Sequence, residues 1–349
     1  MPAVGMGTAL PIPVPHEVTK DAVLAAIELG FRHLDTAAMY GTEGPVGEAV
    51  ADAVRRGLLR SREEVFVTSK LWCTTCHPEL VLPSLRETLL KLQMEYVDLY
   101  LIHWPVCMKP GPITWPAKRE DAVPFDFEGV WLAMEECHRL GLAKAIGVSN
   151  FTTRHLERVM SVATITPAVN QVELNPVWQQ RTLRAYCAEK GIHVAAYSPL
   201  GGQNWNGSGE ANAVLESEVL SEIAQARGKT VAQGYGIFIE NDWANASLLG
   251  NLALVFCCIT LFLHILLLFK MHQISLRWIH EQGVTWIVKS YNKGRLKQNI
   301  DIFGWELTEE DRLKISQIPQ RKFVTAIALF SPEGEFTSVD LSEMDIVEE

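Results

Sequence analysis

The chain has 349 residues, of which 48% are hydrophobic, and its formal net charge is −10. This length can bury one large barrel or the cores of two ordinary domains, so length alone does not choose the fold. The negative charge argues against extensive binding to nucleic-acid phosphates, which requires a basic face. An anionic ligand would therefore have to be bound by a local basic cluster.

The cysteines and the N-terminal residues indicate the compartment. Seven cysteines at irregular spacing are typical of free thiols in a reducing environment, not of a disulfide framework. Cys73 and Cys76 form a single CxxC without a second pair, which favours packed or surface thiols over zinc, and we expect no metal. The first residues lack a basic region followed by an apolar core, so no signal peptide is evident and we expect a cytoplasmic protein.

Short apolar runs alternate with helical patterns along the chain. Their near-continuous content of Val, Ile, Leu and Ala is typical of parallel strands that are covered on both faces. The eight predicted strands are Ala3–Thr8, Phe31–Thr36, Val65–Lys70, Val97–His103, Ala143–Ser149, Ala168–Leu174, His193–Ser198 and Trp286–Ser290. Eight such strands favour a closed (β/α)8 TIM barrel.

Amphipathic helices are expected between the strands. The predicted helices are 19–29, 42–58, 78–92, 127–140 and 179–190. Gly141 and Gly191 follow two of them and suit a left-handed cap. Repeated βα units with short links fit either a barrel or a doubly wound sheet. The absence of a GxGxxG turn and helix after the first strand favours the barrel.

One segment interrupts this pattern between the seventh and eighth strands. Residues 228–233 begin a helix that residues 274–283 would complete, so the barrel comprises residues 1–233 and 274–322. The foreign insertion is 234–273, and residues 248–269 are almost wholly apolar. That run exceeds the roughly 18 residues at which a membrane-spanning helix becomes a candidate. Its position inside a helix fits an unspliced intron better than an evolved anchor, and an apolar hairpin packed outside the barrel is the third possibility.

Two long loops and the C-terminal segment are expected to shape a binding site. Residues 107–126 and 201–213 follow predicted strands and are long for structural links. Residues 323–349 form a C-terminal loop and acidic tail, in which aromatic residues would drape over the barrel and the last dozen residues would be disordered.

Four polar residues end or follow predicted strands: Asp35, Tyr40, Lys70 and His103. Because the carboxyl ends of all barrel strands face one mouth, we expect these side chains to converge there. Each residue alone has an ordinary structural explanation, such as a loop cap or a packed aromatic ring. Their joint occurrence at strand ends favours a functional site.

Several ordered motifs resemble those of the aldo-keto reductase superfamily. They include Gly147-Val148-Ser149-Asn150-Phe151, Leu101-Ile102-His103-Trp104-Pro105, Asn170-Gln171-Val172-Glu173 and Tyr197-Ser198-Pro199-Leu200. The resemblance covers residues 1 to about 340 without the insertion. Residues 123–131 and 175–180 are similar to a plant branch that contains deoxymugineic acid synthases, methylecgonone reductases and chalcone-forming reductases, which implies plant secondary metabolism. We expect the short N-terminal hairpin of the family to be absent.

The resemblance implies reduction of an aldehyde or ketone by NADPH, with Tyr40 as general acid. A free tyrosine has a pKa of about 10, and the ammonium of Lys70 is expected to lower it toward the working range. Asp35 would keep Lys70 charged and in place. His103 would orient the substrate carbonyl through a ring N–H.

The resemblance also implies which residues bind the cofactor. Ser149, Asn150 and Gln171 match positions that hold the nicotinamide amide, and Tyr197 matches the ring that stacks on it. The remaining matched positions are Gly7, Thr8, Ser198, Leu200, Lys289, Ser290, Arg295 and Asn299. Lys289 and Arg295 would supply the local positive charge that a 2′-phosphate requires.

The substrate pocket is expected to have an apolar aromatic wall made of Trp72, Trp104, Trp178 and Phe323, although core packing explains Trp178 equally well. We expect a monomer that binds a small carbonyl compound. Two alternatives stay open. One is a non-catalytic NADPH-binding subunit, since fold does not fix function. The other is a membrane-anchored reductase or an inactive product of a retained intron.

Overall fold

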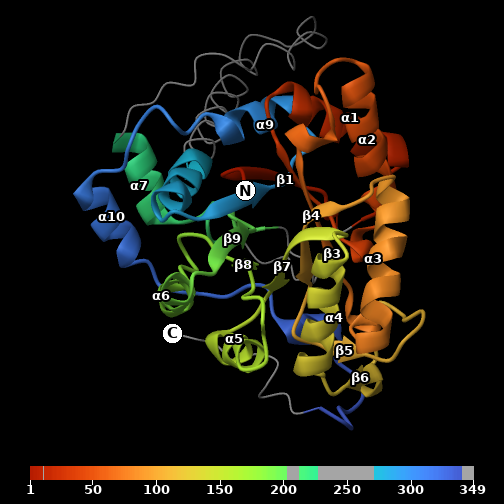
Figure 1. Ribbon diagram of the computed structural model, residues 1–349. Helices are drawn as coiled ribbons and strands as arrows, with labels where there is room; N and C mark the ends of the chain where they lie inside the picture. Colours follow the sequence, from red (N-terminus) through yellow and green to blue (C-terminus); the bar gives the residue numbers. More distant parts are fainter. Residues whose placement is uncertain (11, 203–211, 227–270, 340–349) are drawn as a thin grey trace, which may run out of the picture.

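The computed structural model describes residues 1–10, 12–202, 212–226 and 271–339 of the chain. In these residues eight parallel strands form a closed barrel in the order β1-β10-β9-β8-β7-β4-β3-β2 (Figure 1). The strands are β1 (Val4–Gly7), β2 (His33–Asp35), β3 (Phe66–Leu71), β4 (Val97–Ile102), β7 (Ala143–Ser149), β8 (Val169–Glu173), β9 (His193–Tyr197) and β10 (Thr285–Val288). All eight predicted strands are confirmed, most of them shorter than predicted.

Helices surround the barrel as the βα repeat predicts (Figure 1). They are α1 (His16–Glu28), α2 (Glu43–Arg55), α3 (Pro78–Leu92), α4 (Phe127–Arg139), α5 (Thr153–Met160), α6 (Arg181–Lys190), α7 (Glu218–Ala226), α9 (Lys293–Ile300) and α10 (Glu309–Ser316). Gly141 and Gly191 have φ of 75° and 72°, so the predicted left-handed positions after α4 and α6 are confirmed. Helices α5, α7, α9 and α10 have no counterpart among the five helices predicted between the strands.

The main core lies between the barrel strands and these helices. Its largest fully buried side chains include Trp131 of α4, Trp286 of β10, Tyr100 of β4 and Phe31 before β2. Apolar side chains on both faces of short parallel strands explain why the strand runs carry so few polar residues. The polar exceptions lie mainly at the strand ends, where the mouth of the barrel opens.

The described part of the chain resumes at the last three residues of the predicted insertion, with a helix over residues 271–281. Ile274, Trp278 and Ile279 of this helix are buried. Met271 is also buried, at 2% exposure, although it precedes the predicted junction. No helix within the described ranges is long and apolar enough to cross a membrane, and the predicted span 248–269 lies outside them.

A second, smaller core joins the long loop after β4 to the C-terminal residues. This loop contains a short hairpin of β5 (Cys107–Met108) and β6 (Ala122–Val123), and the C-terminal segment contains the 3₁₀ turn η5 (Ala326–Leu329). The amide of Ala117 donates to the Leu329 carbonyl at 2.9 Å, and Ser331 donates back to Ala117 at 2.7 Å. Figure 1 shows the C-terminal segment passing beside this hairpin.

Candidate functional site

The structure brings the four predicted rim residues together. Asp35 ends β2, Lys70 lies in β3, His103 follows β4, and Tyr40 ends the 3₁₀ turn η1 (Ala38–Tyr40). Lys70 Nζ lies 2.6 Å from Asp35 Oδ1 and 3.4 Å from the Tyr40 hydroxyl. That hydroxyl is 3.3 Å from His103 Nε2. A proton on Tyr40 is therefore in hydrogen-bond reach of two other titratable groups.

The ion pair at the base of this site is fully desolvated. The side chain of Lys70 has no exposed surface, and that of Asp35 is 4% exposed. Lys70 also donates to the Thr36 carbonyl at 3.0 Å, and Gln171 Nε2 donates to the second Asp35 oxygen at 2.8 Å. Burial alone would lower the pKa of Lys70, but the charges of Asp35 and Tyr40 raise it above its ordinary value. Lys70 is consequently an ammonium at neutral pH.

The pKa of Tyr40 differs from the sequence-based prediction. Burial raises it above its ordinary value of 10.0, and this effect outweighs the lowering by Lys70. The prediction that Lys70 would bring the pKa below 10 is therefore wrong for this site. The phenol is fully protonated at neutral pH, which is the form that a general acid requires.

His103 is neutral in this environment. Burial, and then the charge of Lys70, hold the pKa of His103 well below its ordinary range. Its Nδ1 is buried and has no hydrogen-bond partner, whereas Nε2 faces the Tyr40 hydroxyl. The indole of Trp72 packs edge-on against the imidazole at 5.2 Å. A neutral imidazole can donate one N–H to a carbonyl oxygen without adding charge.

Polar residues on three neighbouring strand ends form the second half of the mouth. Tyr197 donates to Asn150 Oδ1 at 2.6 Å, and Asn150 Nδ2 donates to the His103 carbonyl at 2.9 Å. Ser149 donates to the Gln171 carbonyl at 2.8 Å. Asn150 has φ of 64°, in the left-handed region that asparagine tolerates best after glycine. The predicted nicotinamide-binding residues are thus adjacent, linked to one another and bonded to the residue that carries the imidazole.

Four further predicted positions lie around this group. The Thr8 hydroxyl donates to the Asp35 carbonyl at 3.0 Å and so braces the end of β2. At Gly7 a Cβ atom would lie 2.9 Å from the Ile287 side chain, so the close approach of β1 and β10 excludes a larger residue. Ser198 and Leu200 follow β9, and both are partly exposed. Their positions suit contacts with a ligand that extends outward from Tyr197.

A basic cluster lies where β10 ends and α9 begins. The pKa of Lys289 is lowered by burial and then by the charge of Arg295. Arg295 also lowers the pKa of His272, which burial brings to about 4. Ser290 and Asn299 are each 6% exposed. Cations that repel one another in this way fit an anionic group such as a phosphate.

The aromatic residues predicted to line the pocket lie in different packing environments. Trp72 and Trp104 belong to the second core, with Ala326, Leu329 and Phe330. Trp178 instead lines a small cavity with Asn150 and Tyr197. Phe323 packs against the main core beneath the Arg321 guanidinium.

Glu173, the last residue of β8, is a buried polar residue of the mouth that was not among the predicted site residues. Its carboxylate is 2% exposed and accepts hydrogen bonds from the C-terminal segment. Its position two residues after Gln171 could have indicated a place in the site, because residues at i and i+2 of a strand share a face.

The comparisons with known proteins agree with this geometry. The model of the aldo/keto reductase family matches residues 3–255. The chain belongs to the aldo/keto reductase family. It is 51% identical to deoxymugineic acid synthase 1 of Oryza sativa subsp. japonica over 342 residues, which covers 97% of this chain and 93% of that protein.

Two further relatives show how widely the similarity extends. A (1S)-1,7-diacetoxy-luvungin A aldo-keto reductase of Citrus sinensis is 48% identical, with 97% of this chain and 93% of that protein covered. The structure of a Bombyx mori aldo-keto reductase in complex with NADP superposes with a TM-score of 0.72 at 32% identity, covering 94% of this chain and 92% of that one. The predicted family and barrel fold are therefore confirmed.

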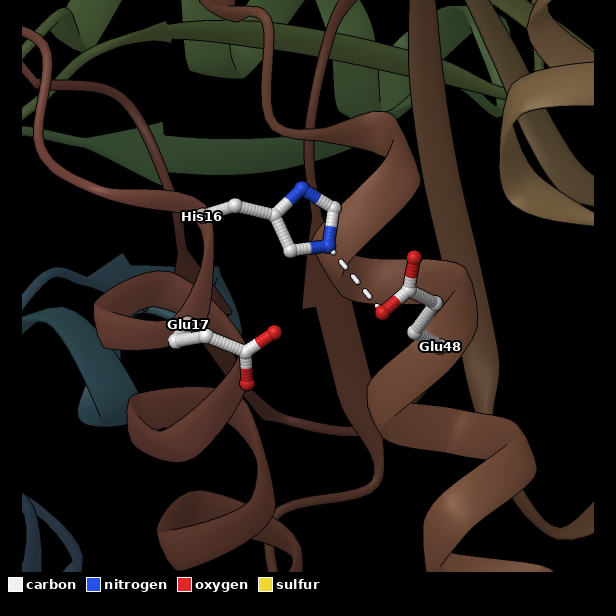
Figure 2. Close-up of side chains that lie close together, drawn as sticks. All are labelled: His16, Glu17 and Glu48. Atoms are coloured by element: carbon white, nitrogen blue, oxygen red, sulfur yellow. Dashed lines mark ion pairs between the residues drawn. The ribbon is translucent and has the colours of Figure 1, made fainter.

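One group of side chains outside the mouth has the composition of a metal site. His16, Glu17 and Glu48 of α1 and α2 lie close together, as Figure 2 shows. Nε2 of His16 is 3.1 Å from Glu48, but the ammonium of Lys20 lies 3.7 Å from both glutamates. Lys20 already supplies the positive charge, and this partly exposed group carries no metal assignment. Cys73 and Cys76 are buried free thiols, as predicted.

Proposed function

We propose that this protein reduces an aldehyde or ketone to an alcohol with NADPH, and that Tyr40 delivers the proton. The observation that carries the proposal is the contact of the Tyr40 hydroxyl with both Lys70 and His103. These contacts combine a protonated phenol, a charged ammonium and a neutral imidazole within one desolvated site. That combination suits protonation of a carbonyl oxygen better than hydrolysis, because no activated nucleophile is present in the tetrad.

The residues of the mouth fit NADPH. Ser149, Asn150 and Gln171 offer amide and hydroxyl groups at adjacent strand ends, and the ring of Tyr197 lies beside them. At the end of β10, Lys289 and Arg295 suit the 2′-phosphate that distinguishes NADPH from NADH. NADPH bound there would supply the hydride that reduces the carbonyl carbon.

The chain's own residues would complete the reaction. His103 would hold the substrate oxygen through its Nε2–H, next to the Tyr40 hydroxyl. The phenolic proton moves to that oxygen as its negative charge develops, and the Tyr40 O–H bond breaks. The ammonium of Lys70, fixed by Asp35, stabilises the resulting phenolate until a proton from solvent restores Tyr40.

The test is oxidation of NADPH by the purified protein with a panel of keto acids, cyclic ketones and aromatic aldehydes. Turnover with at least one class of carbonyl is expected. Binding of NADPH without turnover of any carbonyl would instead favour the non-catalytic subunit. We also propose a monomer in the cytoplasm, and the free, buried cysteines in the described ranges support a reducing compartment.

We further propose that residues 234–273 are an insertion foreign to the barrel. Residues 271–273 precede Ile274 in the full chain, and residues 231–233 would precede it if the insertion were removed. Excision of the insertion would put Val231 in place of the buried Met271, and Gln233 in place of Gln273. Gln273 donates to the Asp301 carbonyl at 3.2 Å, a bond that the replacing glutamine could keep.

A deletion of residues 234–273 tests this proposal against the full-length protein. The deletion is expected to retain NADPH-dependent turnover and to raise the soluble yield, because a long apolar run is removed. Partition of both proteins into membranes separates a membrane anchor from an accidental insertion. A soluble and active full-length protein, together with an inactive deletion, would show that the insertion is an evolved part of the enzyme.

A further inference from the structure

We propose that Glu173 is a positioning residue that fixes the C-terminal segment 318–331 over the barrel mouth and thereby sets the affinity for the carbonyl substrate. This inference rests on the proposed function, and it adds a residue that the tetrad and the cofactor set do not include.

Glu173 ends β8, the strand between β7 and β9, whose ends carry Ser149 and Tyr197. It shares a strand face with Gln171, whose side chain donates to Asp35. Across the sheet its register partner is Tyr197 of β9, which is bonded to Asn150. The carboxylate therefore stands beside the residues proposed to bind the nicotinamide.

One carboxylate oxygen holds two consecutive backbone amides of the C-terminal segment. Oε2 accepts from the N–H of Phe323 at 3.0 Å and from that of Val324 at 2.8 Å. Two backbone contacts fix the segment on either side of this point. Arg321 donates to the Val177 carbonyl at 2.7 Å, and the Leu329 carbonyl accepts from Ala117 at 2.9 Å. Glu173 is the side-chain anchor between these two contacts.

The segment held by Glu173 packs against the wall of the catalytic site. Val324 and Phe330 contact the second core, which also contains Trp72 and Trp104. Trp72 in turn packs against the imidazole of His103 at 5.2 Å. Release of residues 323 and 324 would therefore loosen the apolar wall next to the group that orients the substrate carbonyl.

The other carboxylate oxygen is not explained by stability. Oε1 is buried and has no hydrogen-bond partner of normal geometry, and Glu173 lines a cavity of about 30 Å³ together with Trp178 and Lys322. Burial raises the pKa of Glu173 to about 7, whereas the two amides, the charge of Lys322 and the side chain of Asn175 act in the opposite direction. A half-bonded buried carboxylate is costly. Its placement is better explained by the segment that it holds than by any gain in stability.

The chain provides a matched control in Glu135 of α4. This buried glutamate also accepts two consecutive amides, those of Thr164 at 2.7 Å and Ile165 at 2.8 Å. The loop that it holds lies before β8, away from the rim residues. Loss of Glu135 should therefore reproduce a structural effect of losing such a carboxylate without any effect on the substrate pocket.

The experiment compares Glu173→Ala, Glu173→Gln and Glu135→Ala in the full-length protein. Glu173→Ala is expected to lower kcat/KM for the carbonyl by about tenfold or more through KM, since each hydrogen bond to a charged group has that scale. Glu173→Gln retains an acceptor oxygen and should stay near the wild-type KM. All three variants should bind NADPH with wild-type affinity, and Glu135→Ala should keep the wild-type KM.

Amide hydrogen exchange supplies a readout that does not depend on turnover. Glu173→Ala should speed exchange at Phe323 and Val324, while Glu173→Gln should not. Unchanged exchange would overturn the assignment, and so would faster exchange with an unchanged KM. A wild-type protein without turnover would overturn the proposed function, whereas the exchange rates would still decide whether Glu173 holds the segment.

A double variant tests whether Glu173 acts through the segment. Phe330→Ala alone should raise KM, because it removes part of the wall that the segment contributes. Combining it with Glu173→Ala should give less than the product of the two separate effects, as for residues that share one path. Independent, multiplying effects would contradict the proposed route.

Discussion

Asp35 and Glu173 are two buried carboxylates in the same barrel mouth, but they bond to different kinds of group. Asp35 uses both oxygens on side chains, the ammonium of Lys70 at 2.6 Å and the amide of Gln171 at 2.8 Å. Glu173 uses one oxygen on two backbone amides and leaves the other without a partner. The first arrangement fixes charges and the second fixes a segment of chain.

This difference predicts two kinetic signatures within one site. Disturbing the charges around Asp35 should change the chemical step, and hence kcat, because those groups act on the developing negative charge. Disturbing the segment should change substrate affinity, and hence KM. On the proposed roles, the same residue class would serve catalysis at Asp35 and substrate recognition at Glu173.

The largest expected effect lies on the Asp35 side, at the proton donor. Tyr40→Phe keeps the ring but removes the proton, so kcat should fall by about 10² to 10⁴-fold while NADPH still binds. Stopped-flow turnover and a fluorescence titration with NADPH measure the two quantities. Turnover close to that of the wild type would remove Tyr40 from the chemical step.

Lys70→Met breaks the ion pair and should affect both rate and stability. Removing the ammonium leaves the Asp35 carboxylate buried without its charge partner, which costs about 3–5 kcal/mol in the free energy of unfolding. The phenolate of Tyr40 also loses its stabilising charge, so kcat should fall as in Tyr40→Phe.

The double variant Lys70→Met with Asp35→Asn separates the two consequences of losing Lys70. It should recover part of the stability, because the unpaired charge is gone, but none of the turnover. Recovery of turnover in the double variant would mean that Lys70 has only a structural role. Urea unfolding and steady-state kinetics are the measurements.

The choice between NADPH and NADH should depend on the basic cluster of Lys289 and Arg295, which belongs to neither side of the comparison between Asp35 and Glu173. Lys289→Ala combined with Arg295→Ala should weaken NADPH binding by tenfold or more per residue and leave NADH binding nearly unchanged, because charge-assisted bonds to a phosphate contribute roughly 1.5–3 kcal/mol each. Dissociation constants for both cofactors provide the test. Equal weakening of both would place the 2′-phosphate elsewhere.

The smallest effect concerns the pH dependence of stability and contrasts Glu173 with Glu135. The pKa of Glu173 is raised by burial from 4.5 to about 7, so its contribution to stability is fully present below about pH 4.5 and is lost as the pH rises to 7. Burial alone would raise the pKa of Glu135 too, but bonds from Ile165 and Thr164 lower it below 4.5. Its contribution is therefore present above pH 4.5 and is lost only at lower pH.

Urea unfolding at pH 5 and pH 8 distinguishes these two glutamates. Relative to Glu173→Gln, the wild type should lose about 2 kcal/mol of unfolding free energy between these pH values. Relative to Glu135→Gln, the unfolding free energy of the wild type should stay constant over the same pH range. Parallel behaviour of the two variants would show that the half-bonded carboxylate of Glu173 is not protonated near neutral pH.

The barrel could be predicted from the sequence because its strands are marked twice, by continuous apolar runs and by polar residues at their ends. The rim followed from topology, since parallel strands place Asp35, Lys70 and His103 at one mouth. The reversed pKa shift of Tyr40 could not be predicted, because it depends on how deeply folding buries the phenol. Helix α5 was missed because its start depends on a capping box between Thr152 and His155, which an apolar pattern does not reveal.

The path of the C-terminal segment was the least predictable part. Its aromatic residues indicated that it covers the barrel, but not which strand holds it. The contact with Glu173 uses backbone amides, which any sequence would offer at positions 323 and 324. Glu173 at the end of β8 was the sign of this contact in the sequence. A single acidic residue within a family motif does not predict a contact with backbone amides unless the fold is known.

The position of segment 318–331 after all eight strands has a consequence for synthesis. During translation the strands and the residues of the cofactor set leave the ribosome first, and the segment that completes the substrate wall leaves later. On the proposed roles, the residues that would bind the nicotinamide are therefore synthesised before the segment that would complete the substrate wall.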